Sequence, residues 1–260
     1  MKINLFQVDA FSDHLFGGNP AAVCPLDEWL PDITMQQIAM ENNLSETAFF
    51  VKKDDGFTIR WFTPLEEVDL CGHATLASAH VIFNHLHWDR PSISFMSRSG
   101  ILVVTRKDGM ITLNFPSDDF HPVEPPAGLL ASLNVKPLET YEGKTDIMLV
   151  LDSQKTVELV EPDFGLMKKS GGRGVMVTAR GDEVDFVSRF FAPQVGVDED
   201  PVTGSAHTTL IPYWSKHLGK SDLTALQLSK RKGHIWCKYL GDRVEITGKA
   251  ITYLTGQIDI

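Results

Sequence analysis

Two hydrophobic periods alternate along the first half of the chain. Residues 3–11 and 57–62 alternate apolar and polar side chains, as strands with one buried face do. Residues 34–43 and 73–87 instead carry apolar side chains at helical spacing. A Thr-x-x-Gln pattern starting at Thr34 is typical of a capping box. This mixture of periods predicts an α+β fold.

The second half has the same mixture of periods. Pro212 lies inside its longest helical pattern and has no N–H to donate, so we expect a kink or a late start there. Gly219 follows that pattern and suits the position after a helix end. The predicted strands are 145–151, 156–160, 174–179 and 185–191, and the predicted helices are 127–133 and 205–218.

A proline-rich stretch at 122–126 indicates a linker between the halves. It follows a hairpin predicted over 101–105 and 110–115, with its turn at Lys107-Asp108-Gly109. We therefore expect two domains, one over residues 1–117 and the other over 118–249.

One segment of the first half recurs in the second. The eight residues from Phe57 to Pro64 match those from Phe186 to Pro193, 129 positions later. Without a gap, the same offset sets Cys71 opposite Asp200. The match favours a duplicated domain with a pseudo-twofold axis over a chance likeness of two strands. A thiol facing a carboxylate would be a plausible acid/base pair.

Composition narrows the class of protein. The chain has 260 residues, 43% of them hydrophobic and 22% charged, which is typical of a packed globular protein. A net charge of −10 disfavours nucleic-acid binding, and no apolar run reaches the ~18 residues of a membrane span. The three cysteines are odd in number and far apart, which favours a reducing, cytoplasmic location.

The sequence offers no cofactor motif and no regular metal motif. His80 and His87 could share a helix face, but no acidic ligand accompanies them at a typical spacing. The segment Gly171-Gly172-Arg173-Gly174 lacks the Lys-Ser/Thr of a phosphate loop and indicates a surface loop. We expect neither a metal nor a cofactor.

Each predicted domain has a helix that opens on small residues. The two starts are Cys71-Gly72-His73 and Thr203-Gly204-Ser205. Free N–H groups and the positive end of the helix dipole make such a start attractive to an anion. Two of them facing one cleft between the domains would hold a small carboxylated metabolite.

Four blocks of residues carry a family resemblance that spans nearly the whole chain. The sequence resembles the PhzF family of phenazine-biosynthesis-type isomerases, which share the diaminopimelate epimerase fold. The blocks are Val8-Asp9-Ala10-Phe11 with Gly17-Gly18-Asn19-Pro20-Ala21, Asn43-Leu44-Ser45-Glu46-Thr47-Ala48-Phe49, Asp69-Leu70-Cys71-Gly72-His73-Ala74-Thr75, and Asp200-Pro201-Val202-Thr203-Gly204-Ser205-Ala206.

The resemblance implies a fold and an activity. It implies two pseudo-symmetric domains, each a curved, mostly antiparallel sheet wrapped around a central helix. A strand at 250–260 would return to the first domain, and the protein would form a homodimer. The implied activity is cofactor-independent proton transfer at a carbon of a small carboxylated metabolite, without nucleic-acid or membrane partners.

The resemblance also implies roles for individual residues. Glu46 matches the family's proton shuttle, a general acid/base in the cleft, with His73 and Asp200 beside it. Thiol-dependent epimerases of this fold have a cysteine before each helix, and this chain keeps only the first. His73, Asp200 and Ser205 match the family's substrate-contacting positions. From the residues themselves, Gly72 and Gly204 would let a substrate approach the backbone closely, and Asn19 is either a turn former or a contact to the substrate.

Other readings stay open. A single-thiol racemase or epimerase would pair Cys71 with Glu46 or Asp200. A non-catalytic metabolite-binding protein would keep the cleft without turnover. From the residues alone, Glu46 could be a solvated loop carboxylate, and Asp200 before Pro201 could serve only a turn.

Overall fold

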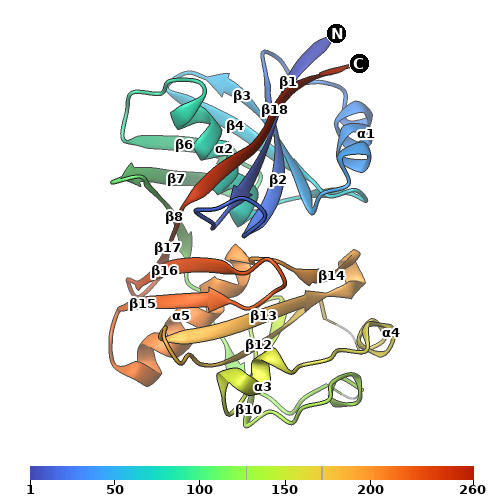
Figure 1. Cartoon of the computed structure of the whole chain (residues 1–260), viewed down its shortest axis with the longest axis vertical. Coiled ribbons are helices and arrows are strands. Elements are labelled where there is room, and N and C mark those ends of the chain that lie inside the picture. Colours follow the sequence, from blue (N-terminus) through green and yellow to red (C-terminus); the bar gives the residue numbers. More distant parts are fainter. Residues whose placement is uncertain (127, 171) are drawn as a thin grey trace. The chain divides into compact units, whose positions relative to one another are not determined.

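The computed structural model describes residues 1–126, 128–170 and 172–260, and the chain forms two compact units (Figure 1). Unit 1 comprises Met1–Phe115 and Ile246–Ile260, and unit 2 comprises Pro116–Glu245. The sequence predicted the end of the first domain at residue 117 and the return of the chain to it at residue 250. The chain leaves unit 1 within one strand and returns to it within another, so no separate linker lies between the units.

Unit 1 is a sheet with two helices. Its strands are β1 (Lys2–Ala10), β2 (Asn19–Leu26), β3 (Glu46–Lys53), β4 (Gly56–Phe62), β5 (Glu67–Val68), β6 (Ser92–Ser97), β7 (Gly100–Lys107), β8 (Met110–Pro116), β17 (Arg243–Gly248) and β18 (Ala250–Asp259), and its helices are α1 (Asp32–Asn42) and α2 (Gly72–Asn84). β8 and β17 each run across the boundary with unit 2.

Unit 2 has the same kind of composition. Its strands are β9 (His121–Pro122), β10 (Glu139–Glu142), β11 (Asp146–Val150), β12 (Gly174–Arg180), β13 (Phe186–Ala192), β14 (Val197–Asp200), β15 (Asp222–Gln227) and β16 (Gly233–Tyr239). Its helices are α3 (Gln154–Glu158), α4 (Phe164–Met167) and α5 (Gly204–Leu218), with 3₁₀ turns η1 (Leu130–Ser132) and η2 (Pro193–Val195).

Strand pairing follows the same order in both units. In unit 1, β2–β3 is parallel, β3–β4 antiparallel, β4–β6 parallel and β6–β7 antiparallel. In unit 2, β11–β12, β12–β13, β13–β15 and β15–β16 repeat that order of parallel and antiparallel pairs. Each parallel pair is joined through a helical crossover, as parallel strands require. The structure therefore confirms the α+β class and the duplicated architecture.

Helices cover both faces of the central strands. In β12, Val175, Val177 and Ala179 belong to a hydrophobic cluster that also contains Val157 of α3. Thr178 points to the other face, where its hydroxyl accepts a hydrogen bond from the Trp214 indole of α5 at 2.9 Å. Strands buried on both faces lose the alternation of a half-exposed strand. This is why β12 is apolar along most of its length.

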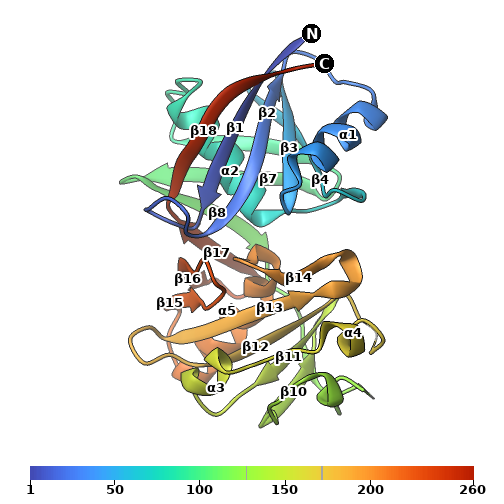
Figure 2. The ribbon, with the colours of Figure 1, turned by 45° about the vertical axis from the view of Figure 1, so that its right-hand side comes forward.

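The final strand runs along the first one. β18 pairs with β1 in antiparallel register from Ala10↔Ala250 to Lys2↔Asp259, and Figure 2 shows the two side by side. The N–H of Ile260 donates to the carbonyl of Met1 at 2.9 Å, so the chain ends meet. The structure thus gives the C-terminal strand to unit 1, as the family resemblance implied.

Helix α5 is continuous through Pro212 and begins at Gly204, so the expected late start is wrong. Proline leaves the carbonyl of Thr208 without its helical donor. The backbone N–H of Asp118 donates to that carbonyl at 3.1 Å and takes the place of the missing bond. Gly219 ends the helix in the left-handed region, as the sequence predicted.

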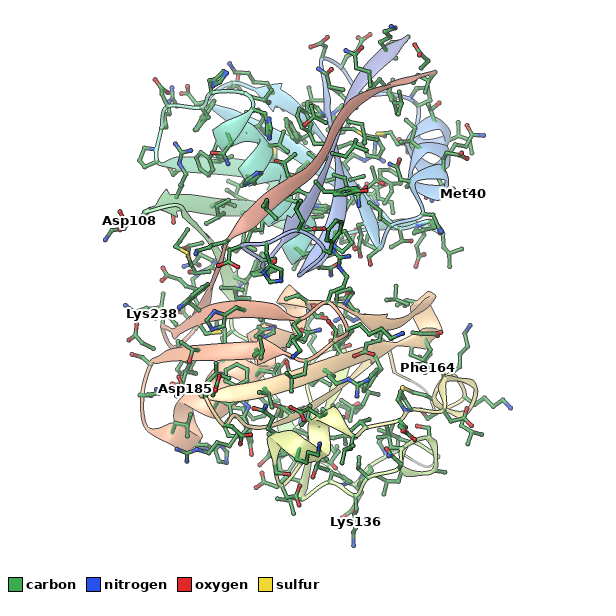
Figure 3. The ribbon with its side chains drawn as sticks, in the orientation of Figure 1. Met40, Asp108, Lys136, Phe164, Asp185 and Lys238 are labelled. Atoms are coloured by element: carbon green, nitrogen blue, oxygen red, sulfur yellow. The ribbon has the colours of Figure 1, made fainter. Side chains whose placement is uncertain are left out.

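Several local predictions are corrected or confirmed. The strand expected at 156–160 is wrong, because α3 occupies Gln154–Glu158. The helix expected at 127–133 is only the turn η1, and residue 127 lies outside the described residues. The hairpin at Asp108 is confirmed: that residue and the following glycine have positive φ, and Figure 3 shows it at the tip of β7 and β8.

The capping box expected at Thr34 is also wrong. Helix α1 begins two residues earlier, with Pro31 as its N-cap, and no side chain caps it. The N–H groups of Thr34 and Met35 both donate to the Pro31 carbonyl. Met35, Ile38 and Ala39 form the buried face, and Met40 points outward in Figure 3. The apolar spacing was therefore a better guide to this helix than its capping pattern.

Candidate active site

Glu46 is placed by the turn that connects α1 to β3. Asn43 ends α1 in the left-handed region, with φ of 49°, and the chain then enters β3 at Glu46. β3 lies parallel to β2, with Glu46 beside Ala21. The side chain of Glu46 is 17% exposed, in a region where the following β3 residues are buried. The structure thus replaces the solvated loop reading with a largely buried carboxylate.

His73 comes from the first turn of α2. Cys71 is the N-cap residue in extended conformation, and Gly72 begins the helix. Nε2 of His73 lies 3.2 Å from Oε2 of Glu46, and the histidine side chain is only 5% exposed. Burial lowers the pKa of His73 to about 3. The imidazole is therefore neutral at pH 7 and carries one proton, on one of its two nitrogens.

Cys71 completes a cluster of three side chains. Its Sγ lies 3.6 Å from Nδ1 of His73. Glu46, Cys71 and His73 form the only group within the described parts of the chain whose potential ligand atoms gather within 4.8 Å. A thiol, an imidazole and a carboxylate at this separation could hold a metal ion, so the absence of a metal stays a prediction.

Asn19 lies near this cluster in the sheet. It begins β2 and is fully buried, and its strand neighbour two residues on, Ala21, pairs with Glu46. Gly18 before it has φ of 61°, and a Cβ there would lie 2.1 Å from the Ala10 carbonyl oxygen. Only glycine fits that turn, so the segment before Asn19 is fixed. A substrate contact by Asn19 stays a prediction.

Asp200, Gly204 and Ser205 lie in unit 2 around the start of α5. Thr203 Oγ1 donates to Asp200 Oδ2 at 2.5 Å. The fully buried Gln227 of β15 accepts from the Thr203 N–H at 2.9 Å and donates to the Asp200 carbonyl at 2.8 Å. The amide of Gln227 therefore holds the loop that presents Asp200. Sequence reasoning missed Gln227, because its distance along the chain gives no signal of this contact.

Ser205 has a cationic neighbour that the sequence did not single out. Arg173 Nη2 donates to Ser205 Oγ at 3.1 Å and also pairs with Asp146, whose side chain is 5% exposed. Arg173 belongs to the glycine-rich segment interpreted as a surface loop, of which Gly171 lies outside the described residues. Its side chain is 39% exposed. The feature of the sequence that could have pointed to Arg173 is its position as a single arginine among glycines.

The structure corrects the alignment of the two halves around the site. Arg60 binds both oxygens of Glu67, and Arg189 binds both oxygens of Glu199. The arginines are 129 positions apart, whereas the glutamates are 132 apart. The inserted residues fall in the region of η2, between β13 and β14.

The starts of α2 and α5 keep the larger offset, so Cys71 corresponds to Thr203. The sequence had set Cys71 opposite Asp200, and that correspondence is wrong. By the same offset His73 corresponds to Ser205. The second cysteine of a two-thiol epimerase would therefore stand where this chain has threonine.

Comparisons with known proteins agree with this architecture. The family model for phenazine biosynthesis-like proteins, PhzC-PhzF, matches residues 8–256. The chain belongs to the PhzF family. An uncharacterized isomerase of Pseudomonas aeruginosa is 50% identical over the full length of both chains. A phenazine biosynthesis-like domain-containing protein of Homo sapiens is 38% identical, with 99% of each chain covered.

Solved structures place the fold in a wider group. A PhzF family protein of Enterococcus faecalis has a TM-score of 0.95 and 46% identity, with both chains fully covered. A probable proline racemase of Agrobacterium radiobacter has a TM-score of 0.66 at 10% identity, over 99% of this chain and 93% of its own. That second likeness concerns the fold alone. It agrees with an epimerase-like architecture for the PhzF family.

Proposed function

We propose that this protein is a cofactor-independent isomerase that moves a proton between two carbons of a small carboxylated metabolite, with Glu46 as general acid/base. The observation that carries the proposal is the contact between the Glu46 carboxylate and the neutral, buried His73 at 3.2 Å. The relatives named isomerases support the reaction class. The coarser conclusion, an isomerase of the PhzF family, does not depend on the choice of Glu46.

Proton balance in the proposed reaction needs only one carboxylate. Glu46 takes a proton from a carbon of the substrate, and the C–H electron pair moves into the conjugated acid. The same proton then returns to another carbon, which restores the Glu46 carboxylate. A largely buried carboxylate suits both steps, because apolar surroundings favour a group that can take and give a proton.

Negative charge that develops on the substrate needs stabilisation. The first N–H groups of α2 have no partner within the helix, and the helix dipole adds a positive potential at Gly72 and His73. An Nε2–H tautomer of His73 would add a donor beside Glu46. Fixed donors of this kind lower the energy of an enolate-like intermediate. The proposal assigns this role to the start of α2.

We assign Asp200 and Ser205 to substrate recognition within the same proposal. Their support is the fixed geometry around each: Gln227 holds the Asp200 loop, and Arg173 donates to Ser205. A carboxylate such as Asp200 suits an amino or hydroxyl group of the substrate. Gly204 begins α5 and would offer its backbone N–H.

The test is proton NMR in D₂O with a panel of small amino and hydroxy acids that includes a dihydroxyanthranilate-type diene acid. Wild type should introduce deuterium or rearrange the substrate, and Glu46→Gln should slow this by about 10²–10⁴-fold. Glu41→Gln, which changes an exposed carboxylate on α1, is the matched control and should keep wild-type activity. Equal rates for Glu46→Gln and wild type would contradict the assignment.

The single-thiol epimerase is the second candidate, and the contact between Cys71 and His73 favours it. It predicts exchange at one stereocentre that survives Glu46→Gln and is lost in Cys71→Ala. Tight ligand binding without exchange or rearrangement would instead support a metabolite-binding protein. The same NMR panel, extended by line broadening of bound ligands, separates these outcomes.

A further inference from the structure

Three side chains of unit 1 bring three different donor atoms together: the thiol of Cys71, the imidazole of His73 and the carboxylate of Glu46. Each offers one atom to a set in which no two atoms are more than 4.8 Å apart. Nε2 of His73 lies 3.2 Å from Oε2 of Glu46, and Sγ of Cys71 lies 3.6 Å from Nδ1 of the same ring. The set comes from the start of α2 and the start of β3, so one unit holds all of it.

We propose that Cys71, His73 and Glu46 form a binding site for a zinc ion. Four-coordinate zinc has bonds of about 2.0–2.3 Å to nitrogen, oxygen and sulfur, which sets its ligand atoms about 3.3–3.7 Å apart. The separation of 3.2 Å between the nitrogen and the oxygen already agrees with this geometry. Since no pair in the set exceeds 4.8 Å, shifts of roughly 1 Å complete the three ligands. The fourth position would stay open to water.

The histidine of this set has a buried nitrogen that lacks a partner. The His73 side chain is 5% exposed, and its Nε2 makes no hydrogen bond within the described residues. The close approach of Nε2 to Oε2 of Glu46 is therefore a contact between two potential ligand atoms and not a hydrogen bond. A buried polar atom without a partner costs free energy. An ion bound to Nε2 would remove this cost.

Charge balance favours a divalent ion. The Cys71 thiolate and the Glu46 carboxylate together equal the charge of Zn²⁺ in magnitude, so the bound set is neutral where little water reaches it. The thiol proton passes to solvent as the zinc–sulfur bond forms. Cys71 is the N-cap of α2, and the positive end of that helix stabilises a thiolate. Since the same end disfavours an unpaired cation, the ion needs both anionic ligands.

The chemistry of the three donors selects the kind of metal. Sulfur and imidazole nitrogen are poor ligands for Mg²⁺ and Ca²⁺, which prefer oxygen. Zn²⁺ accepts sulfur, nitrogen and oxygen ligands in tetrahedral geometry, and three protein ligands with one open position are typical of exchangeable zinc. The sequence predicted no metal, because Glu46 and Cys71 lie 25 residues apart and form no regular metal motif. The zinc site revises that expectation.

Under the proposed function, zinc would inhibit the isomerase. This consequence rests on the assignment of Glu46 as general acid/base, whereas the site itself rests on the geometry of the three side chains. A carboxylate bound to zinc cannot take a proton from a carbon of the substrate. The ion would also lie beside the first N–H groups of α2, where the substrate's negative charge is to be stabilised. The enzyme would therefore be active without the metal and inactive with it.

Cobalt is the probe for the site, because Co²⁺ occupies zinc sites and its absorbance reports on the ligands. Protein purified with a chelator, and kept reduced without added thiols, is titrated with Co²⁺ in the absence of substrate. Wild type should show the intense visible bands of a four-coordinate site and a thiolate-to-cobalt charge-transfer band. Zn²⁺ should remove both, and Mg²⁺ should remove neither. A titration without the charge-transfer band would overturn the proposal.

Single variants test each ligand in the same titration. Cys71→Ser should lose the charge-transfer band. Cys71→Ser, His73→Gln and Glu46→Gln should each weaken metal binding by about 10²-fold or more, since loss of even an outer-shell partner costs 10–100-fold. Cys24→Ala removes the other thiol of unit 1 and is the matched control, which should keep both the band and the affinity. Equal affinities of Cys71→Ser and wild type would contradict the site. Circular dichroism of each variant establishes that it is folded.

Inhibition is measured in the D₂O exchange assay of the proposed function. Zn²⁺ at concentrations that displace cobalt should slow exchange by wild type, and a chelator should restore it. Cobalt binding with the thiolate band, but without loss of exchange in zinc, would contradict the assignment of Glu46 as the catalytic group and leave the site established. Exchange by wild type without any cobalt binding would contradict the site and leave the proposed function standing.

Discussion

His80 of α2 and His85, which follows that helix, both contact the hydroxyl of Thr252 on β18. Asn84 donates to Nδ1 of His80 at 3.0 Å, so His80 carries its proton on Nε2, which lies 3.0 Å from Thr252 Oγ1. The Thr252 hydroxyl can then donate to Nε2 of His85 at 2.8 Å. Since Nδ1 of His80 accepts a hydrogen bond, the His80 imidazole is neutral in this arrangement.

The sign of the pH effect at His80 follows from its environment. Burial, together with the neighbouring His85, lowers the pKa of His80 from 6.5 to about 4. Between pH 6.5 and 4 the unfolded chain binds a proton that the folded chain does not. The free energy of unfolding therefore falls as the pH falls through this window, by about 1.4 kcal/mol per pH unit for one such group.

We predict that His80→Gln reduces the stability loss between pH 7 and pH 5 by about 2 kcal/mol relative to wild type. Urea unfolding at the two pH values measures this difference. His87→Gln, an exposed position just after the helix, is the control and should keep the wild-type pH dependence. An equal loss in His80→Gln and wild type would show that this histidine does not set the acid sensitivity.

At the scale of elements, the paired arginines of the two units are the clearest repeated feature. Arg60 lies 5.2 Å from the ring centre of Phe62, and Arg189 lies 5.0 Å from that of Phe191. Each also binds a glutamate through both carboxylate oxygens. Arg189 has additional contacts, since its Nη1 donates to the Val160 carbonyl at 2.7 Å. Through its bonds to Glu199 and to this carbonyl, Arg189 thus links β13 to β14 and to the segment after α3.

We predict that Arg189→Lys lowers the free energy of unfolding by about 1.5–3 kcal/mol, because lysine cannot make the two-pronged bond or reach the carbonyl at the same time. Thermal unfolding followed by circular dichroism checks this value. Arg90→Lys alters an exposed ion pair with Asp55 and serves as control, with an expected change below ~1 kcal/mol. Similar losses of unfolding free energy in both variants would show that the two-pronged bond of Arg189 contributes no more than an exposed ion pair.

Periodicity predicted most long elements, but short ones depended on caps. The segment from Thr156 to Val160 contains β-branched residues and was interpreted as a strand. In the structure, the Ser153 side chain accepts the Thr156 N–H at 3.2 Å and starts α3 instead. Local hydrogen bonding by serine at an N-cap outweighed strand propensity. The serine was visible in the sequence, but its cap could not be separated from an ordinary turn.

Site prediction depended on both local motifs and tertiary contacts. The motif Cys71-Gly72-His73 and the glutamate 25 residues before that cysteine come together in the structure, and their roles stay predictions. Spacing alone could not show that the thiol and the carboxylate lie beside the same imidazole ring. Gln227 and Arg173 were missed because their partners lie 24 and 32 residues away in the sequence.

At the scale of the whole molecule, the duplication extends to topology. Both units use parallel pairs joined by helices and antiparallel neighbours, although sequence likeness was visible mainly between β4 and β13. Strand order can stay the same after most residues have changed, because one apolar side chain can replace another in the core. A changed connection between strands would alter the fold itself. No helix of the described chain is long and apolar enough to cross a membrane. Homodimer formation stays a prediction, which light scattering can test.

Because Met1 and Ile260 lie next to each other, the order in which the units follow along the chain can be changed by design. A circularly permuted protein could join Ile260 to Met1 through a short glycine linker and open the exposed turn between Gly241 and Asp242. Unit 1 would then be one uninterrupted stretch of chain, preceded by residues 242–245 and followed by the rest of unit 2. We expect this permutant to fold and to unfold cooperatively, as circular dichroism during thermal unfolding would show. A folded permutant would show that the fold of unit 1 does not require its interruption along the chain.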